Sequence, residues 1–352
     1  MAANSRMLVR YGKSSRDLLK HKHSLFEQND MHQEEADRVA ALYTHQPRRT
    51  RCKCCEGALD HHSFTKMGID YAVCIRCGHL NGGHEDTEAF CSSIYIEDRG
   101  AHQRSFDAES EAHYRDRTND IYVPKAEFLI DALNATGEDP KCLSFADLGA
   151  GSGYFVAALL HCGLVNAKGF ETSEGQIGLA KRMLGNGKIE FCDLDEAIHI
   201  AATLDAEVFS LVHVLEHVRE PRKLLAALKQ NPSVKYIFLA VPLFSPCVYF
   251  EMIFPTVFHR HLTCGHTHLF SESSIDWLCS EFELIRVAEW WFGTDILDWY
   301  RNVMVRIHQQ PETAKMADKW AELWAPAIDD LQLELDRRRM SSEVHLLLRI
   351  ER

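Results

Sequence analysis

Short apolar runs alternate with helical stretches through the middle of this chain, and this alternation limits its fold more than any other feature. Where helices separate consecutive strands, the strands run parallel and the helices cover the faces of the sheet. The apolar runs are residues 142–148, 166–171, 188–192, 207–214 and 235–242, followed by two more candidate strands at 283–292 and 345–351. The sequence therefore predicts an α/β fold with a parallel sheet flanked by helices.

The 352 residues are more than one domain of typical size needs, and their composition changes along the chain. Residues 1–50 are polar with helical spacing of their apolar side chains, and they predict an N-terminal helical arm. We place the later boundaries at 51–90 for a small cysteine-rich module, 91–140 for a linker ending in a helix, and 141–352 for the main domain. Between the last two candidate strands, Trp320, Leu323 and Trp324 follow helical spacing, which predicts a helical insertion before the last strand.

The composition disfavours several classes of protein. Hydrophobic residues at 46% and charged residues at 26% are typical of a soluble globular protein, and no segment reaches the roughly 18 apolar residues of a membrane span. The basic residues of Met1–Arg16 are not followed by an apolar stretch with a cleavage site, so we expect no export and a cytoplasmic location. The formal net charge of −12 disfavours nucleic acid as a partner.

The strongest motif is a glycine-rich turn between the first apolar run of the main domain and a helix. It reads Asp147-Leu148-Gly149-Ala150-Gly151-Ser152-Gly153 and is followed by Tyr154. Glycines allow a tight turn and let a ligand approach the backbone closely. A dinucleotide-binding turn requires glycine where Tyr154 stands, and the carboxylate of Asp147 would repel a pyrophosphate. Both residues weaken an NAD-dependent oxidoreductase as an interpretation and favour a cofactor with positive charge.

The order D-x-G-x-G-x-G resembles motif I of class I S-adenosylmethionine-dependent methyltransferases. The resemblance implies a Rossmann-like sheet of seven strands and S-adenosylmethionine as the cofactor. It also implies that Glu171, at the end of the second apolar run, binds the ribose hydroxyls, and that Asp193, after the third run, lies beside the adenine amino group. The cofactor-binding residues predicted in this way are Asp147, Gly149, Gly151, Gly153, Glu171, Asp193 and His213.

Four cysteines in the pattern C-x2-C-x18-C-x2-C predict a metal site. They are Cys52, Cys55, Cys74 and Cys77. Each pair can hold one edge of a tetrahedron, and four thiolates suit a structural Zn2+ ion. A redox-active C-x-x-C pair would be expected at a strand-to-helix junction, which this module lacks. Cys54 is either a spare thiol or a replacement ligand.

A cysteine module ahead of a methyltransferase domain resembles the sugar C-methyltransferases that act on deoxysugar nucleotides, and related methyltransferases of polysaccharide biosynthesis. The resemblance implies a small-molecule acceptor, a sugar or nucleotide sugar used in surface polysaccharide or secondary metabolite biosynthesis. Those sugar C-methyltransferases carry a further large C-terminal domain, and this chain differs from them in that respect.

The fourth apolar run leads into His213-Val214-Leu215-Glu216-His217-Val218, which resembles the post-strand motif of many class I methyltransferases. Methyl transfer is an in-line displacement in which positioning supplies much of the acceleration, and a base is needed when the acceptor holds its proton tightly. The sugar C-methyltransferases have an Asn-x-x-x-His pair at the spacing of His213 and His217. This resemblance predicts His217 as the catalytic base, while His213 departs from the family's asparagine.

A second group of histidines follows the fifth apolar run, where class I enzymes often build acceptor-binding surface. Its members are His259, His261, His266 and His268. Glu216, His217, His266 and His268 together could hold a divalent metal, an arrangement that resembles small-RNA 2′-O-methyltransferases, although that family has glutamate at the place of His213. The alternatives to sugar methylation are therefore metal-assisted RNA 2′-O-methylation and a catalytically inactive, zinc-anchored binding protein.

Overall fold

The computed structural model describes residues 7–21, 24–95, 109–194, 196–262 and 266–352. Seven strands of its main sheet are β5 (Phe145–Leu148), β6 (Ala167–Glu171), β7 (Ile189–Phe191), β8 (Val208–Val212), β9 (Tyr236–Pro242), β11 (Leu284–Phe292) and β12 (Glu343–Ile350). They stand in the order β11-β12-β9-β8-β5-β6-β7. The strands from β9 to β7 pair parallel, and β12 runs antiparallel to both β9 and β11. The predicted α/β fold with these seven strands is confirmed.

An eighth strand, β1 (Leu8–Tyr11), extends the sheet beyond β11 and was not predicted. It runs parallel to β11, with Leu8 opposite Ala288. Residues 1–50, expected to form a helical arm, thus contribute a strand before their helices α1 (Ser15–His21), α2 (Ser24–Glu27) and α3 (Asn29–Thr44). Four residues at the edge of a sheet, none of them fully buried, carry too weak a pattern to be recognised.

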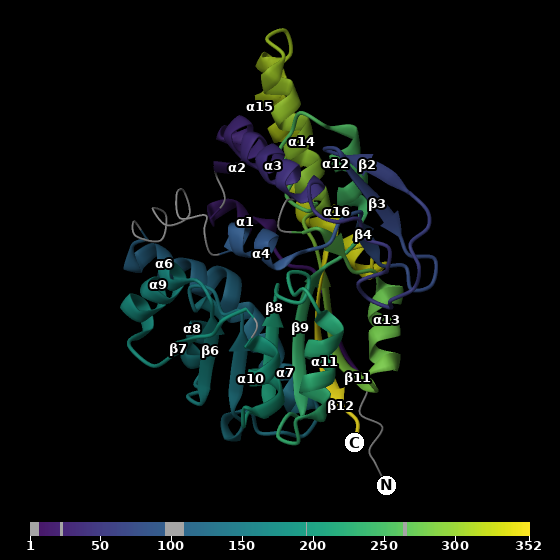
Figure 1. Ribbon diagram of the computed structural model, residues 1–352. Helices are drawn as coiled ribbons and strands as arrows, with labels where there is room; N and C mark the ends of the chain where they lie inside the picture. The colour runs from purple at the N-terminus through teal and green to yellow at the C-terminus, as the bar shows by residue number, and fades with distance from the viewer. Residues whose placement is uncertain (1–6, 22–23, 96–108, 195, 263–265) are drawn as a thin grey trace.

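Helices cover both faces of the main sheet, as Figure 1 shows. They are α7 (Val123–Ala135), α8 (Tyr154–His161), α9 (Glu174–Leu184), α10 (Ala197–Thr203), α11 (Pro221–Gln230) and α13 (Glu272–Glu281). The helix α12 (Pro246–Ile253), which follows β9, packs instead against residues of the cysteine module. Consecutive strand residues point to opposite faces, so Phe238 packs with α7 and α8 while Leu239 packs with α11 and α13. This burial on both faces explains why the strands read as nearly continuous apolar runs.

The predicted helical insertion lies between β11 and β12. It consists of α14 (Asp295–Gln309), α15 (Ala317–Trp324) and α16 (Ile328–Arg337), with short 3-10 turns at Ala314–Met316 and Ala325–Ala327. Trp299, Trp320 and Trp324 pack together with ring centres 4.7 to 5.4 Å apart. The insertion rises above the main sheet at one end of the molecule (Figure 1).

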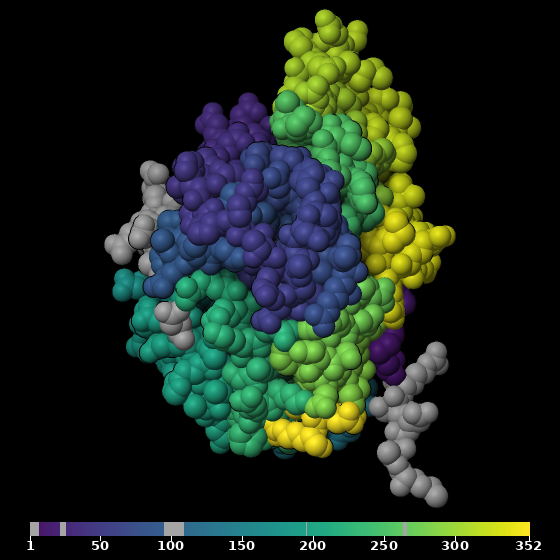
Figure 2. Space-filling model, turned by 45° about the vertical axis from the view of Figure 1, so that its right-hand side comes forward, coloured from purple at the N-terminus to yellow at the C-terminus, as the bar shows by residue number. Residues whose placement is uncertain are grey.

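A second, four-stranded sheet joins the cysteine module to the main domain. Its strands are β2 (Phe64–Lys66), β3 (Ile69–Val73), β4 (Leu80–Gly82) and β10 (His268–Leu269), in the order β10-β4-β3-β2. β10 comes from the main domain and pairs antiparallel with β4, so that His268 stands opposite Asn81. In Figure 2 the purple and blue N-terminal segments cover one face of the molecule and contact its teal and green parts. The module is therefore built into the main domain by shared strand pairing.

The helix α4 (Glu88–Tyr95) follows the module, and α6 (Glu111–Arg117), a π-helical turn η1 (Thr118–Tyr122) and α7 lead into β5. A 3-10 turn at Pro140–Cys142 precedes that strand. Within the described ranges, no helix is both long and apolar enough to cross a membrane.

Candidate active site

The glycine-rich turn lies where it was predicted, between β5 and α8. Gly149 and Gly151 have φ angles of 65° and 56°, in the left-handed region that side chains disfavour. A Cβ atom on Gly149 would lie 2.7 Å from a methyl carbon of Val214, which is closer than atoms pack. The turn therefore requires glycine for its backbone angles and for the close approach of the loop after β8.

Three acidic residues stand at the carboxyl ends of neighbouring strands, as predicted. Asp147, near the end of β5, is 3% exposed and accepts a hydrogen bond from Ser210 Oγ at 2.6 Å. Burial raises the pKa of Asp147 to about 7. Asp193 follows β7 and is exposed.

Glu171, at the end of β6, forms hydrogen bonds with both the glycine turn and the loop that follows β6. One carboxylate oxygen accepts a hydrogen bond from Gly151 N at 2.8 Å, and the other accepts from Thr172 N and Ser173 N at 2.9 and 2.8 Å. Parallel strand ends meet at one edge of a sheet, which brings Glu171 beside the turn.

Two cavities flank the glycine turn and share Gly149, Gly151 and Gln176 in their walls. The larger, of about 440 Å³, is also lined by Glu171, Asp193, His213 and His217. The smaller, of about 280 Å³, is also lined by Asp147, Arg117, Tyr122 and Tyr154. Gly153 lines neither cavity, because a Cβ there would face Leu184 at 2.9 Å in the packing under α8. Apart from Gly153, the structure brings the predicted cofactor-binding residues together around one cleft.

His213 lies at the start of the loop after β8 with a φ of 56°, an unusual angle for a side chain of this size. Its Nε2 atom is 2.9 Å from Glu343 Oε1, and its Nδ1 atom is 3.4 Å from Glu216 Oε1. Burial alone would lower the pKa of His213, but the two carboxylates outweigh burial and raise the pKa above its usual value.

Glu216 is a fully buried carboxylate surrounded by imidazoles. It is 0% exposed, and neither of its oxygens accepts a hydrogen bond from the described part of the chain. Besides His213, its Oε1 atom faces His217 Nε2 at 3.9 Å and His266 Nε2 at 4.0 Å. Burial would raise the pKa of Glu216, but the histidines lower it below its usual value. Burial lowers the pKa of His266 to about 3.

The remaining histidines of the second group have other partners. His259 Nε2 lies 2.9 Å from the carbonyl of Phe254, and His261 contacts the carbonyl of Leu243. His268 Nδ1 lies 2.8 Å from His79 Nε2, on the cysteine module. A carboxylate oxygen of Glu216 and ring nitrogens of His217 and His266 lie within 4.8 Å of one another. His268 does not belong to this group, so the predicted set of four metal ligands is wrong for His268.

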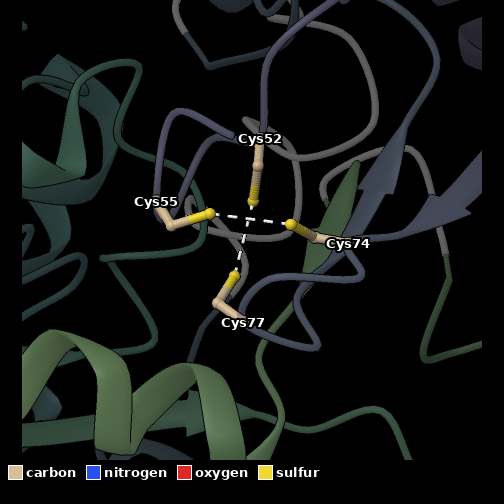
Figure 3. Close-up of side chains that lie close together, drawn as sticks. All are labelled: Cys52, Cys55, Cys74 and Cys77. Atoms are coloured by element: carbon tan, nitrogen blue, oxygen red, sulfur yellow. Dashed lines mark hydrogen bonds between the residues drawn. The ribbon is translucent and has the colours of Figure 1, made fainter. Parts of the chain in front are cut away.

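The four cysteines of the module point their sulfur atoms toward one another (Figure 3). Cys52 Sγ and Cys77 Sγ are 3.6 Å apart, as are Cys55 Sγ and Cys74 Sγ, and all four atoms lie within 4.8 Å of one another. Zinc–sulfur bonds of about 2.3 Å in a tetrahedron place sulfur atoms roughly 3.8 Å apart, so the cluster fits Zn2+. Cys54 lies outside it, with its sulfur 3.6 Å from the carbonyl of Ser274 in α13.

Comparison with known proteins decides the family. The family model described as "Methyltransferase domain" matches residues 112–287, which include the glycine turn, the three acids and the histidine loop. The chain belongs to this methyltransferase family. Together with the fold, this makes the protein an S-adenosylmethionine-dependent methyltransferase. A search of curated protein sequences returns no match.

Among solved structures, the methyltransferase is similar to a magnesium protoporphyrin IX methyltransferase from Synechocystis, with 16% identity, coverage of 56% of this chain and 90% of the other, and a TM-score of 0.40. It is also similar to a geranyl diphosphate C-methyltransferase from Streptomyces coelicolor, with 13% identity, coverage of 70% and 86%, and a TM-score of 0.40.

The cleft of this methyltransferase fits S-adenosylmethionine by its chemistry. The glycine turn has no side chains that would keep a ligand away from the backbone. The buried carboxylate of Asp147 can pair with a positively charged group of the cofactor. The larger cavity adds apolar walls from Phe170 and Ile198, which suit the flat face of a purine.

Several lining residues were not predicted. Arg117 and Tyr122 come from the segment before α7, and Cys91 comes from α4 after the cysteine module. No motif marks any of the three, because each reaches the cleft through the tertiary fold. The only available signal was the aromatic character of the segment before Pro124.

Proposed function

We propose that this methyltransferase transfers a methyl group from S-adenosylmethionine to a small-molecule acceptor, a sugar or nucleotide sugar. The observation that carries the proposal is the larger cavity, which is lined by Glu171, Asp193 and His217 together. A donor held at the acids would have its acceptor beside an imidazole. The domain from 141 to 352 is the catalytic unit in this proposal.

The cofactor roles follow the charges of the cleft. Asp147 pairs with the amino group of the methionine part, Glu171 binds the ribose hydroxyls, and Asp193 lies by the adenine amino group. The turn from Gly149 to Gly153 lets the cofactor approach the backbone, and His213 borders the cofactor from the loop after β8. S-adenosylmethionine, when bound, supplies an electrophilic methyl group on a sulfonium.

His217 is the base that takes the acceptor's proton. Its ring lines the larger cavity, and its Nε2 atom lies 3.9 Å from the buried carboxylate of Glu216. A negative charge at this distance stabilises the imidazolium formed when the acceptor loses its proton. Glu216 acts through His217 and is therefore a positioning residue.

The substrate class rests on two supports. The cysteine module and the His217 motif resemble those of sugar C-methyltransferases, and the histidines around the cavity offer ring nitrogens to a hydroxyl-rich acceptor. The net charge of −12 favours a small molecule over a polyanion.

The test is methyl transfer from labelled S-adenosylmethionine to a panel of nucleotide sugars. His217→Ala is expected to lower kcat by about 10²- to 10⁴-fold and to leave the Kd for S-adenosylmethionine unchanged. His62→Ala is the matched control, because His62 is exposed on the module. Unchanged turnover in His217→Ala would remove the base, and no turnover on any acceptor with intact cofactor binding would favour the inactive binding protein.

The cysteine module, residues 51–90, holds one structural Zn2+ ion at Cys52, Cys55, Cys74 and Cys77. The four buried sulfur atoms, which all lie within 4.8 Å of one another, support this assignment. Asn81 Nδ2 lies 3.5 Å from Cys52 Sγ and donates to it, which stabilises the charge of a thiolate.

One observation favours a second candidate, metal-assisted methyl transfer such as RNA 2′-O-methylation. Glu216, His217 and His266 place their ligand atoms within 4.8 Å of one another, and the carboxylate accepts no hydrogen bond from any residue that the structure describes. Titration with Mn2+, followed by electron paramagnetic resonance, separates the candidates: a second metal beside zinc that Glu216→Gln abolishes would support it, and no binding would reject it.

A further inference from the structure

The smaller cavity beside the glycine turn contains a cation that the proposed cofactor roles do not use. This cavity lies between the turn and the segment before α7. The ionisable groups with carboxyl or guanidinium charge on its wall are Glu109, Asp147 and Arg117. Asp147 is the proposed partner of the amino group, and Glu109 is hydrogen-bonded to His113 Nδ1.

Arg117 is held in a fixed place relative to the glycine turn. Its guanidinium carbon lies 4.8 Å from the ring centre of Tyr154, the first residue of α8. Tyr154 stacks with Tyr114 and Tyr122 at ring-centre distances of 4.4 and 5.2 Å and interplanar angles of 22° and 11°. Tyr114 donates a hydrogen bond from its hydroxyl to the carbonyl of Ser152 at 2.9 Å. Aromatic rings thus connect Arg117 directly to the turn that would hold the cofactor.

The backbone at this point is itself unusual. η1, directly after Arg117, is a π-helical turn in which Val123 N donates to Thr118 O. Such bulges in helices are frequent at functional sites because they change the direction in which side chains point. Here the turn begins directly after Arg117 and ends with Tyr122, and both residues line the same cavity.

The methionine part of S-adenosylmethionine carries both an ammonium and a carboxylate. With the ammonium at Asp147, the carboxylate enters a space already bordered by an acid, where an unpaired anion would be repelled. Three backbone amides of the turn are already engaged: Ala150 N with Phe170 O, Gly151 N with Glu171 and Gly153 N with Ala150 O. Burial would lower the pKa of Arg117, but Tyr122, Tyr154 and the charge of Glu109 raise it. The Glu109 carboxylate is itself hydrogen-bonded to His113 Nδ1.

We propose that Arg117 binds the α-carboxylate of S-adenosylmethionine and thereby selects the complete amino-acid end of the cofactor. The inference rests on the proposed function, in that S-adenosylmethionine is the donor and Asp147 takes its amino group. Arginine suits this role because its planar fork matches a carboxylate with two parallel hydrogen bonds, which the point charge of lysine does not reproduce.

The experiment compares binding of S-adenosylmethionine and decarboxylated S-adenosylmethionine by calorimetry. The two probes differ only in the carboxylate. The wild-type protein is expected to bind S-adenosylmethionine about 10- to 100-fold more tightly than the decarboxylated probe. Arg117→Met is expected to remove most of this ratio by weakening S-adenosylmethionine alone, and Arg117→Lys is expected to keep only part of it.

Arg115→Met is the matched control, because Arg115 lies on the same helix, is exposed and does not line the cavity. Equal losses on both probes in Arg117→Met would assign the arginine to packing of the tyrosines and overturn the proposal. An unchanged ratio would also overturn it. Neither readout involves an acceptor, so a wrong acceptor class or a wrong base leaves this result unaffected.

Discussion

Glu343 Oε1 lies 2.9 Å from His213 Nε2 and so connects the last strand of the sheet to the loop that carries the histidine motif. The same carboxylate oxygen lies 2.6 Å from His345 Nε2 and 3.2 Å from Lys125 Nζ. His213 has a φ of 56°, an angle that costs roughly 1–3 kcal/mol for such a side chain. The ion pair with Glu343 offsets this cost and holds the ring at the edge of the cofactor cleft.

Replacing Glu343 by glutamine should destabilise the protein strongly. The change leaves the buried ammonium of Lys125 and the partly exposed ring of His213 without their carboxylate, and breaking a buried pair costs about 3–5 kcal/mol. Urea denaturation at pH 7 measures the free energy of unfolding. Glu322→Gln is the control, since its pair with Lys319 is exposed and should contribute less than about 1 kcal/mol. Equal losses of unfolding free energy in the two variants would show that Glu343 stabilises the protein no more than an exposed carboxylate does.

Gly149→Ala should abolish or strongly weaken cofactor binding. The added Cβ would meet Val214, which lines the larger cavity, at 2.7 Å, in addition to the strain of a positive φ. Gly163→Ala provides the matched comparison, because Gly163 has a φ of 86° but no heavy atom within 4 Å of the added carbon. We expect Gly163→Ala to lose only roughly 1–2 kcal/mol of stability and to keep its affinity for S-adenosylmethionine. Both are measured by thermal unfolding and calorimetry, and similar affinities in the two variants would contradict the prediction.

The affinity for S-adenosylmethionine should fall as the pH drops below about 7. Burial raises the pKa of Asp147 to about 7, so below that pH the free protein carries a neutral carboxyl group, which attracts an ammonium poorly. Binding then requires loss of a proton, and the Kd should rise by up to tenfold per pH unit below the pKa.

Calorimetry between pH 5.5 and 8 in two buffers of different ionisation enthalpy measures the affinity and the released proton together. Asp147→Asn should bind weakly at every pH and show no such dependence. A pH dependence that persists in Asp147→Asn would assign the titration to another group.

The zinc content should separate Cys54 from its neighbours. Cys74→Ser removes one of the four converging sulfurs and should reduce zinc from about one ion per chain to near zero, with a lower melting temperature. Cys54→Ser should retain zinc, because the Cys54 sulfur contacts the carbonyl of Ser274. Metal analysis of the purified variants is the measurement, and loss of zinc in Cys54→Ser would make Cys54 a ligand.

The main sheet could be predicted because its central strands β5, β8 and β9 are apolar runs buried on both faces, although at the edge strand β7 only Ile189 is buried. The acids of the cleft could be predicted for a related reason: Asp147, Glu171 and Asp193 occupy or follow the ends of neighbouring parallel strands, and those ends meet. β1 and β10 could not be predicted, since none of the four residues of β1 is fully buried and β10 has only two residues.

Contacts between side chains that are far apart in the sequence could not be predicted either. His213 and Glu343 are 130 residues apart, and no local pattern indicates that they touch. The histidines of the second group look equivalent in the sequence, yet among them only His266 faces Glu216. Arg117 lies in a segment without any recognised motif and reaches the cleft through its packing on Tyr154.

Both sheets of this protein need residues from opposite halves of the chain, and this has a consequence for its synthesis. Leu8 pairs with Ala288, and Asn81 on β4 pairs with His268. At roughly 5–20 residues per second, a ribosome takes tens of seconds to deliver the later partner after the earlier one. During that interval β1 and the edge of β4 have unpaired backbone groups. The cysteine module is therefore translated first, but it acquires its complete sheet only after most of the methyltransferase domain has been made.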